Sequence, residues 1–224
     1  MRILVTGFEP FGKLVDNPSQ RLLGQLCAAD FAEGAELHSV RLPTSYRGSE
    51  TLIRELLDEI RPDLCVCLGV AQNRRAVCLE RIAVNLDDCS LADNDGELAS
   101  GREIVPGAAL AIQSVLDLAA VMEQDGADEG AGQGLPLSIS NHAGNFVCNH
   151  VYYAALQHIA EHGLPTKCVF IHVPMTEECR GPGERYDWQL PSQATLHGRV
   201  AGVARRLAQS IQSLPDRLVE EAGD

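Results

Sequence analysis

The sequence predicts an α/β fold, a three-layer α/β/α sandwich around a twisted, mainly parallel open sheet. Two observations lead to this prediction. Short apolar runs alternate with segments of helical periodicity along most of the chain. In addition, the run DLCVCLGV (63–70) is almost continuously apolar, which is typical of a strand covered by helices on both faces.

Each element follows from a local pattern. Strands are expected at the short apolar runs 3–8, 35–43, 63–70, 136–141 and 167–174. Helices are expected at 18–31, at 45–62, from Cys148 onward and at 193–214. Pro18 suits the first turn of its helix. In the second helix one apolar face is formed by Leu52, Ile53, Leu56 and Ile60.

A chain of 224 residues is long enough for one well-buried domain, which we expect to span 1–224. The acidic, glycine-rich stretch EQDGADEGAGQG (123–134) predicts a mobile surface loop, since strand-like sequence resumes directly after it. The polar tail 215–224 is expected to fray.

The charge balance restricts the partners. Lysine and arginine number 18 against 31 acidic residues, which gives a net charge of −13. Nucleic acid and anionic membrane surfaces both require a basic face, so neither is expected as the main partner. The start MRILVTGFEPFG has no long apolar segment of the kind found in signal peptides, and a cytoplasmic location is expected.

The eight cysteines are scattered, which favours reduced thiols over a disulfide scaffold. Cys65 and Cys67 are separated by a single residue, a spacing too short for a zinc knuckle. They would share one face of a strand, and we interpret them as small buried hydrophobic residues.

Cys148 lies in the stretch NHAGNFVCNHVYY (141–153), where a helix is expected to begin. Unpaired N–H groups and the positive end of the helix dipole lower the pKa of a thiol at this position. The small residues Ala143 and Gly144 would let a substrate carbonyl approach the backbone, and the N–H of Cys148 could donate to an oxyanion.

His172 supplies a candidate base. It lies near the end of the apolar run VFIHVP, at the carboxyl end of a strand, where ligands gather in open parallel sheets. From these residues alone two interpretations stay open: a catalytic pair of Cys148 and His172, or a core cysteine and a core histidine.

Four separated blocks resemble one known family. They are TGFEPFG with NPS (6–19), ERIAVN (80–85), SISNHAGNFVCNHVYY (138–153) and FIHVP (170–174). Their order and spacing resemble the pyroglutamyl peptidase I family, the pyrrolidone-carboxylate peptidases, which are cytoplasmic cysteine exopeptidases.

The resemblance implies a function and a set of catalytic residues. The family removes N-terminal pyroglutamate from peptides through an acyl-enzyme, without cofactor or metal, and often as a homotetramer. Carried onto this chain, the nucleophile is Cys148, the base is His172, and the acid that orients the base is Glu80. The roles are those of a catalytic triad.

The resemblance also implies a substrate pocket. The two phenylalanines and the asparagine of the first block fall on Phe8, Phe11 and Asn17, and two rings would sandwich the flat lactam. Val147, before the nucleophile, would offer backbone hydrogen bonds to that lactam.

Two residues depart from the family pattern. Val70 replaces a glutamine, and Ser90 replaces an arginine near the oxyanion site. One oxyanion donor can contribute about 3 kcal/mol to transition-state stabilisation. A catalytically weakened or non-catalytic relative that binds a pyroglutamyl-like ligand therefore stays open as an alternative. Candidates to replace the lost cation are Arg74, Arg75 and Arg81.

A second alternative is a zinc peptidase. HIAEH (158–162) matches the H-x-x-E-H pattern and sets His158 and His162 one helical turn apart. A third ligand is not evident from the sequence, and a histidine near a helix C-terminus is favourable for dipole reasons alone.

Overall fold

The computed structural model describes residues 1–127 and 134–212, and its centre is a six-stranded sheet. The strand order is β2-β1-β3-β8-β4-β7. The bounds are β1 (Arg2–Phe8), β2 (Glu36–Leu42), β3 (Leu64–Val70), β4 (Val77–Glu80), β7 (Leu137–Ser140) and β8 (Lys167–Val173). A separate two-stranded sheet pairs β5 (Ile82–Val84) with β6 (Ala111–Gln113).

The sheet is mixed but mainly parallel. Strands β2, β1, β3 and β8 pair in parallel, and β4 pairs in parallel with β7. The two groups meet where β4 runs antiparallel to β8. The predicted α/β class is therefore confirmed.

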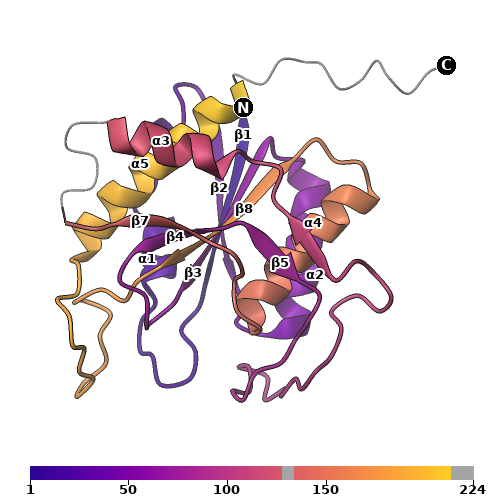
Figure 1. Cartoon of the computed structure of the whole chain (residues 1–224), viewed down its shortest axis with the longest axis horizontal. Coiled ribbons are helices and arrows are strands. Elements are labelled where there is room, and N and C mark those ends of the chain that lie inside the picture. Colours follow the sequence, from indigo (N-terminus) through magenta and orange to yellow (C-terminus); the bar gives the residue numbers. More distant parts are fainter. Residues whose placement is uncertain (128–133, 213–224) are drawn as a thin grey trace.

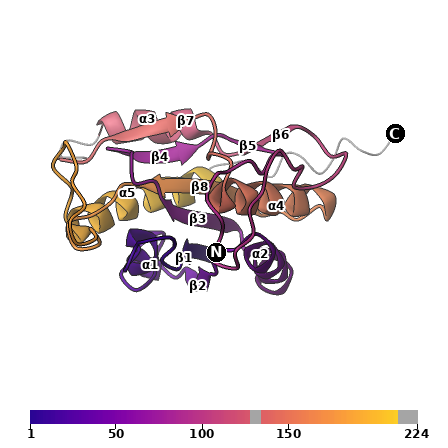
Figure 2. The same ribbon diagram turned by 90° about the horizontal axis from the view of Figure 1, so that it is seen from below.

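Helices cover both faces of the sheet, as Figures 1 and 2 show. The buried clusters assign α1 (Pro18–Leu23), α3 (Leu118–Ala127) and α5 (Gln193–Gln212) to one face. They assign α2 (Tyr46–Ile60) and α4 (Val147–Glu161) to the other. A short 3₁₀ helix, Ala28–Asp30, lies on the face of α5.

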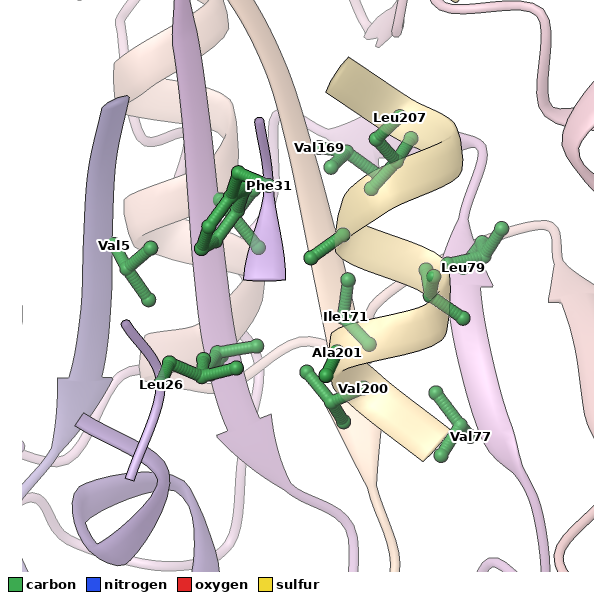
Figure 3. Packing of buried hydrophobic residues seen from close by; sticks show 14 of the residues in the cluster. Val5, Leu26, Phe31, Val77, Leu79, Val169, Ile171, Val200, Ala201 and Leu207 are labelled. Carbon is green, nitrogen blue, oxygen red and sulfur yellow. The ribbon is translucent and has the colours of Figure 1, made fainter. Parts of the chain in front are cut away.

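The central strands alternate between two different cores because successive side chains point to opposite faces. Val66 and Leu68 of β3 join Val169 and Ile171 of β8 against α5 (Figure 3). The alternate side chains of β3 and β8 point to the opposite face of the sheet and pack against α2 and α4. They include Cys65, Cys67, Cys168 and Phe170, which belong to the second buried cluster. The catalytic candidates lie on this second face.

The structure divides or extends several expected elements. The helix expected at 18–31 ends at Leu23, and Gly24 caps it before the 3₁₀ turn. Strands β4, β5 and β6 and helix α3 were not expected from local patterns. No helix among the described residues is long and apolar enough to cross a membrane.

The loop predicted at 123–134 is wrong for residues 123–127, which continue helix α3. The physical reason is Asp125, which is buried and bonds through both carboxylate oxygens to Arg199 of α5, at 2.6 and 2.7 Å. Arg206 adds a further ion pair at 3.0 Å. Residues 128–133 and the tail 215–224 lie outside the described residues.

We predict that Asp125→Asn lowers the free energy of unfolding by about 3–5 kcal/mol, because it breaks the buried ion pair between Asp125 and Arg199. Urea denaturation of both proteins measures the difference. The matched control is Asp187→Asn, since Asp187 pairs with Arg75 on the surface, where the effect should stay below about 1 kcal/mol. Equal losses in the two variants would contradict the assignment of Asp125.

Candidate active site

His172 and Glu80 form the first pair of the site. Nδ1 of His172, near the carboxyl end of β8, lies 2.7 Å from Oε1 of Glu80 at the end of β4. Glu80 is fully buried and His172 is 5% exposed. The Glu80 carboxylate accepts a hydrogen bond from Nδ1–H, which leaves Nε2 of the ring free to act as a base.

Cys148 is held above the strand next to His172. It is the second residue of α4, and its Sγ would lie 2.9 Å from a Cβ placed on Gly69. Gly69 of β3 is the register partner of His172 on β8. Glycine is therefore required here by space, because any side chain would displace the thiol or the ring of Phe170.

Arg74 is a member of the site whose position the sequence left open. Its Nη2 lies 3.0 Å from Oε1 of Glu80, and it also donates to Oγ of Ser140 at 3.1 Å and to the carbonyl of His142 at 3.4 Å. The guanidinium group partly neutralises the buried carboxylate and ties it to the segment that leads to Cys148. We interpret Arg74 as a positioning residue.

The pKa expectation for Cys148 is corrected. Burial, followed by the negative charge of Glu80, raises the pKa of this thiol to about 12. Helix-terminal hydrogen bonding and the charge of Arg74 lower that pKa, but they are the smaller influences. Burial likewise lowers the pKa of His172, against the opposing effect of Glu80. Both members of the pair are therefore neutral at pH 7.

The start of α4 presents unpaired backbone donors. Its N-cap is Phe146, whose side chain offers no acceptor, and the first helical bond runs from the N–H of His150 to the Phe146 carbonyl. The N–H groups of Val147 and Cys148 thus have no acceptor within the helix. Val147 itself is fully buried, and its N–H is positioned beside the thiol by helix geometry.

The rings of Phe8 and Phe11 contact different aromatic residues of the site. The Phe8 ring, 2% exposed, packs 6.4 Å from that of Phe170, which in turn lies 4.8 Å from His172. The Phe11 ring is half-buried and lies 5.8 Å from that of Phe146, directly before the start of α4. Sequence reasoning did not single out Phe146, although its place two residues before Cys148 was a signal.

Asn17 has a structural task in addition to any contact with a ligand. It is fully buried, and as the N-cap of α1 its Oδ1 accepts from the N–H and the hydroxyl of Ser19. Its Nδ2 donates to the carbonyl of Glu9. These bonds hold the segment between β1 and α1, and the substrate contact of Asn17 stays a prediction.

Asn149, the residue after the nucleophile, fastens α4 to β5. Its Oδ1 accepts from the N–H of Val84, and its Nδ2 donates to the carbonyls of Val84 and Leu86. The two motifs ERIAVN and FVCN are thereby joined in space. Sequence reasoning missed this link, because an asparagine at a helix start is commonly exposed.

The two departures from the family pattern lie in different surroundings. Val70 is 6% exposed and packs in an apolar cluster with Leu14 and Met175. Ser90 is exposed. Among the three candidate cations, Arg74 contacts Glu80, whereas Arg75 pairs with Asp187 and stacks on Trp188 at 4.7 Å.

Arg81 lines a separate cavity of about 590 Å³ together with residues 113–119. Arg74 is therefore the candidate that the structure brings to the triad.

The histidines of HIAEH are engaged otherwise. Nε2 of His158 lies 2.8 Å from Oδ1 of Asp58, and Nδ1 of His162 lies 3.0 Å from the carbonyl of His158. Within residues 1–127 and 134–212, neither histidine belongs to a group of three potential metal ligands. The zinc alternative therefore lacks a ligand set in the described structure.

Comparison with known proteins agrees with this arrangement. The model of a family described as pyroglutamyl peptidase matches residues 1–208. The pyrrolidone-carboxylate peptidase of Pyrococcus furiosus is 38% identical over 178 residues, which are 80% of this chain and 83% of the relative. That of Gloeobacter violaceus is 37% identical over 186 residues, 82% of this chain and 87% of the relative.

Solved structures give the same result. Pyroglutamyl peptidase I from Bacillus amyloliquefaciens superposes with a TM-score of 0.82 at 29% identity, covering 93% of this chain and 97% of that chain. Pyrrolidone carboxyl peptidase from Pyrococcus furiosus gives 0.84 at 32% identity, covering 94% and 100%. With its sequence matched almost end to end and its fold shared, the chain belongs to the pyroglutamyl peptidase family.

Proposed function

We propose that this protein is a cysteine omega peptidase that removes N-terminal pyroglutamate from peptides. The observation that carries the proposal is the arrangement of its three groups. The thiol of Cys148 lies over Gly69, the register partner of His172, and His172 is bonded to Glu80 at 2.7 Å. Family membership supplies the substrate class.

The reaction begins from a neutral pair. Because the pKa of Cys148 is raised and that of His172 is lowered, the thiol proton moves to Nε2 of His172 as sulfur attacks the pyroglutamyl carbonyl carbon. The buried carboxylate of Glu80 stabilises the imidazolium that forms. N–H groups at the start of α4 receive the developing oxyanion.

The acyl-enzyme forms when the peptide bond breaks. His172 gives its proton to the leaving amine, and a thioester remains on Cys148. The same imidazole then takes a proton from water, which attacks the thioester and releases pyroglutamate. No cofactor or metal takes part in these steps.

The pocket for the lactam lies between β1 and the start of α4. Phe11 beside Phe146 supplies an aromatic wall, and Phe8 beside Phe170 supplies the floor. The backbone of Val147 donates to the lactam carbonyl. Asn17 fixes the intervening segment through Ser19 and Glu9. A flat, neutral five-membered ring suits such a pocket.

The assembly and location follow the family resemblance. We extend the proposal to a homo-oligomer, a tetramer, and to a cytoplasmic location. Two exposed apolar residues flank strand β6, Leu110 directly before it at 80% exposure and Val115 two residues after it at 69%, and a second copy could cover them. Sedimentation velocity of the purified protein tests the assembly.

The first prediction from the proposed function concerns the nucleophile. The protein should hydrolyse a pyroglutamyl-aminocoumarin substrate, iodoacetamide should abolish the turnover, and a chelator should have no effect. Cys148→Ser should be inactive and folded, whereas Cys179→Ala should remain active. Chelator-sensitive turnover would revive the zinc alternative, and absence of turnover in folded wild-type protein would favour the non-catalytic relative.

The second prediction concerns space over β3. Gly69→Ala should lower kcat/KM by at least about 100-fold, because its methyl group would lie only 2.9 Å from the Cys148 thiol and 2.7 Å from the ring of Phe170 and would displace them. The matched control is Gly198→Ala in α5, whose added Cβ meets no atom within 4 Å. That variant should keep full activity. Unchanged kinetics in Gly69→Ala would refute the placement of Cys148.

The third prediction separates the two effects of Glu80. In Glu80→Gln, kcat should fall by about 10³–10⁴-fold, because an amide does not hold the required imidazole tautomer. The same change removes a charge that raises the pKa of Cys148, so alkylation by iodoacetamide at fixed pH should accelerate. Mass spectrometry of the peptide that contains Cys148 measures this rate. Slower alkylation in the variant would contradict the proposed electrostatics.

A further inference from the structure

Three buried cysteines converge on the face of the sheet that also carries the catalytic site. Cys65 and Cys67 lie on β3, and Cys168 lies on β8 as the register partner of Cys65. The three Sγ atoms lie within 4.8 Å of one another, and those of Cys65 and Cys67 are 3.9 Å apart. All three residues are at most 1% exposed.

The spacing of the thiols suits a three-coordinate soft metal ion. With metal–sulfur bonds of about 2.3 Å, the sulfurs of a planar trigonal site lie about 4.0 Å apart. Thiolates select Cu(I) and zinc among the common cations. Zinc is almost always four-coordinate in structural sites, and in the described structure no fourth histidine, cysteine or carboxylate joins this group.

We propose that Cys65, Cys67 and Cys168 bind one soft monovalent cation of the Cu(I) class, directly beneath the catalytic thiol. Binding replaces the protons of the three ligating thiols, which pass to the solvent, and no oxidation or reduction is required. The site is independent of peptide hydrolysis.

The test uses the full-length Cys148→Ser variant, so that the catalytic thiol does not compete. The reduced protein is titrated anaerobically with Cu(I) against a chelator of known affinity, which removes ions held by single surface thiols. Native mass spectrometry should show one Cu(I) per chain. X-ray absorption should show three sulfur neighbours at about 2.3 Å.

Matched substitutions locate the site. In the same background, Cys67→Ala should weaken Cu(I) binding by at least about 100-fold. Cys179→Ala, which removes a buried cysteine outside the cluster, should leave binding unchanged. Equal effects of the two substitutions, or failure of the folded protein to retain Cu(I), would overturn the proposal. If Cys67→Ala does not fold, the X-ray absorption of the Cu(I)-loaded Cys148→Ser variant decides. Three sulfur neighbours around Cu(I) support the site, and two overturn it.

Discussion

The pairing of β3 with β8 is the constraint on which the site depends. Its register sets Gly69 beside His172 and Cys67 beside Phe170. Side chains alternate along a strand, so a shift of one residue would turn Leu68 toward α4 and bury Gly69 on the opposite face. The bulk of Leu68 would then occupy the space of the Cys148 thiol. The apolar residues that face α5 therefore fix the catalytic geometry indirectly, because they hold the register (Figure 3).

The second dependence is electrostatic. Glu80 is buried at the boundary between the parallel strands and the β4–β7 pair, and its Oε1 accepts a hydrogen bond from His172 and forms an ion pair with Arg74. A buried carboxylate without such partners would take up a proton. Arg74 therefore does more than neutralise charge: its bonds to Ser140 and to the His142 carbonyl connect the carboxylate to the chain segment before α4. The acid and the nucleophile are positioned together.

The sequence predicts the parts of this arrangement that are local. The strands 63–70 and 167–174 and the start of α4 carry clear apolar patterns, and they bring Cys148 and His172 to one region. Glu80 lies 92 residues from His172, so only family resemblance identified it. Arg74 was one of three equivalent arginines until the fold placed it. The direction of the Cys148 pKa was mistaken, because helix position is a local property and burial is not.

The three residues of the triad lie at different depths below the protein surface. Because β4 runs antiparallel to β8, His172 is opposite Cys78, and Glu80 lies one row deeper, opposite Phe170. Glu80 is accordingly fully buried, His172 is 5% exposed, and Cys148 is half-buried. The thiol is therefore more accessible to water than the carboxylate of Glu80. Because solvent screens a buried charge only weakly, Glu80 acts strongly on the imidazolium of His172. A parallel β4 in the same position would have presented its terminal acid at the solvent edge, beside the substrate. The single antiparallel pairing of the sheet thus sets the order of the three groups.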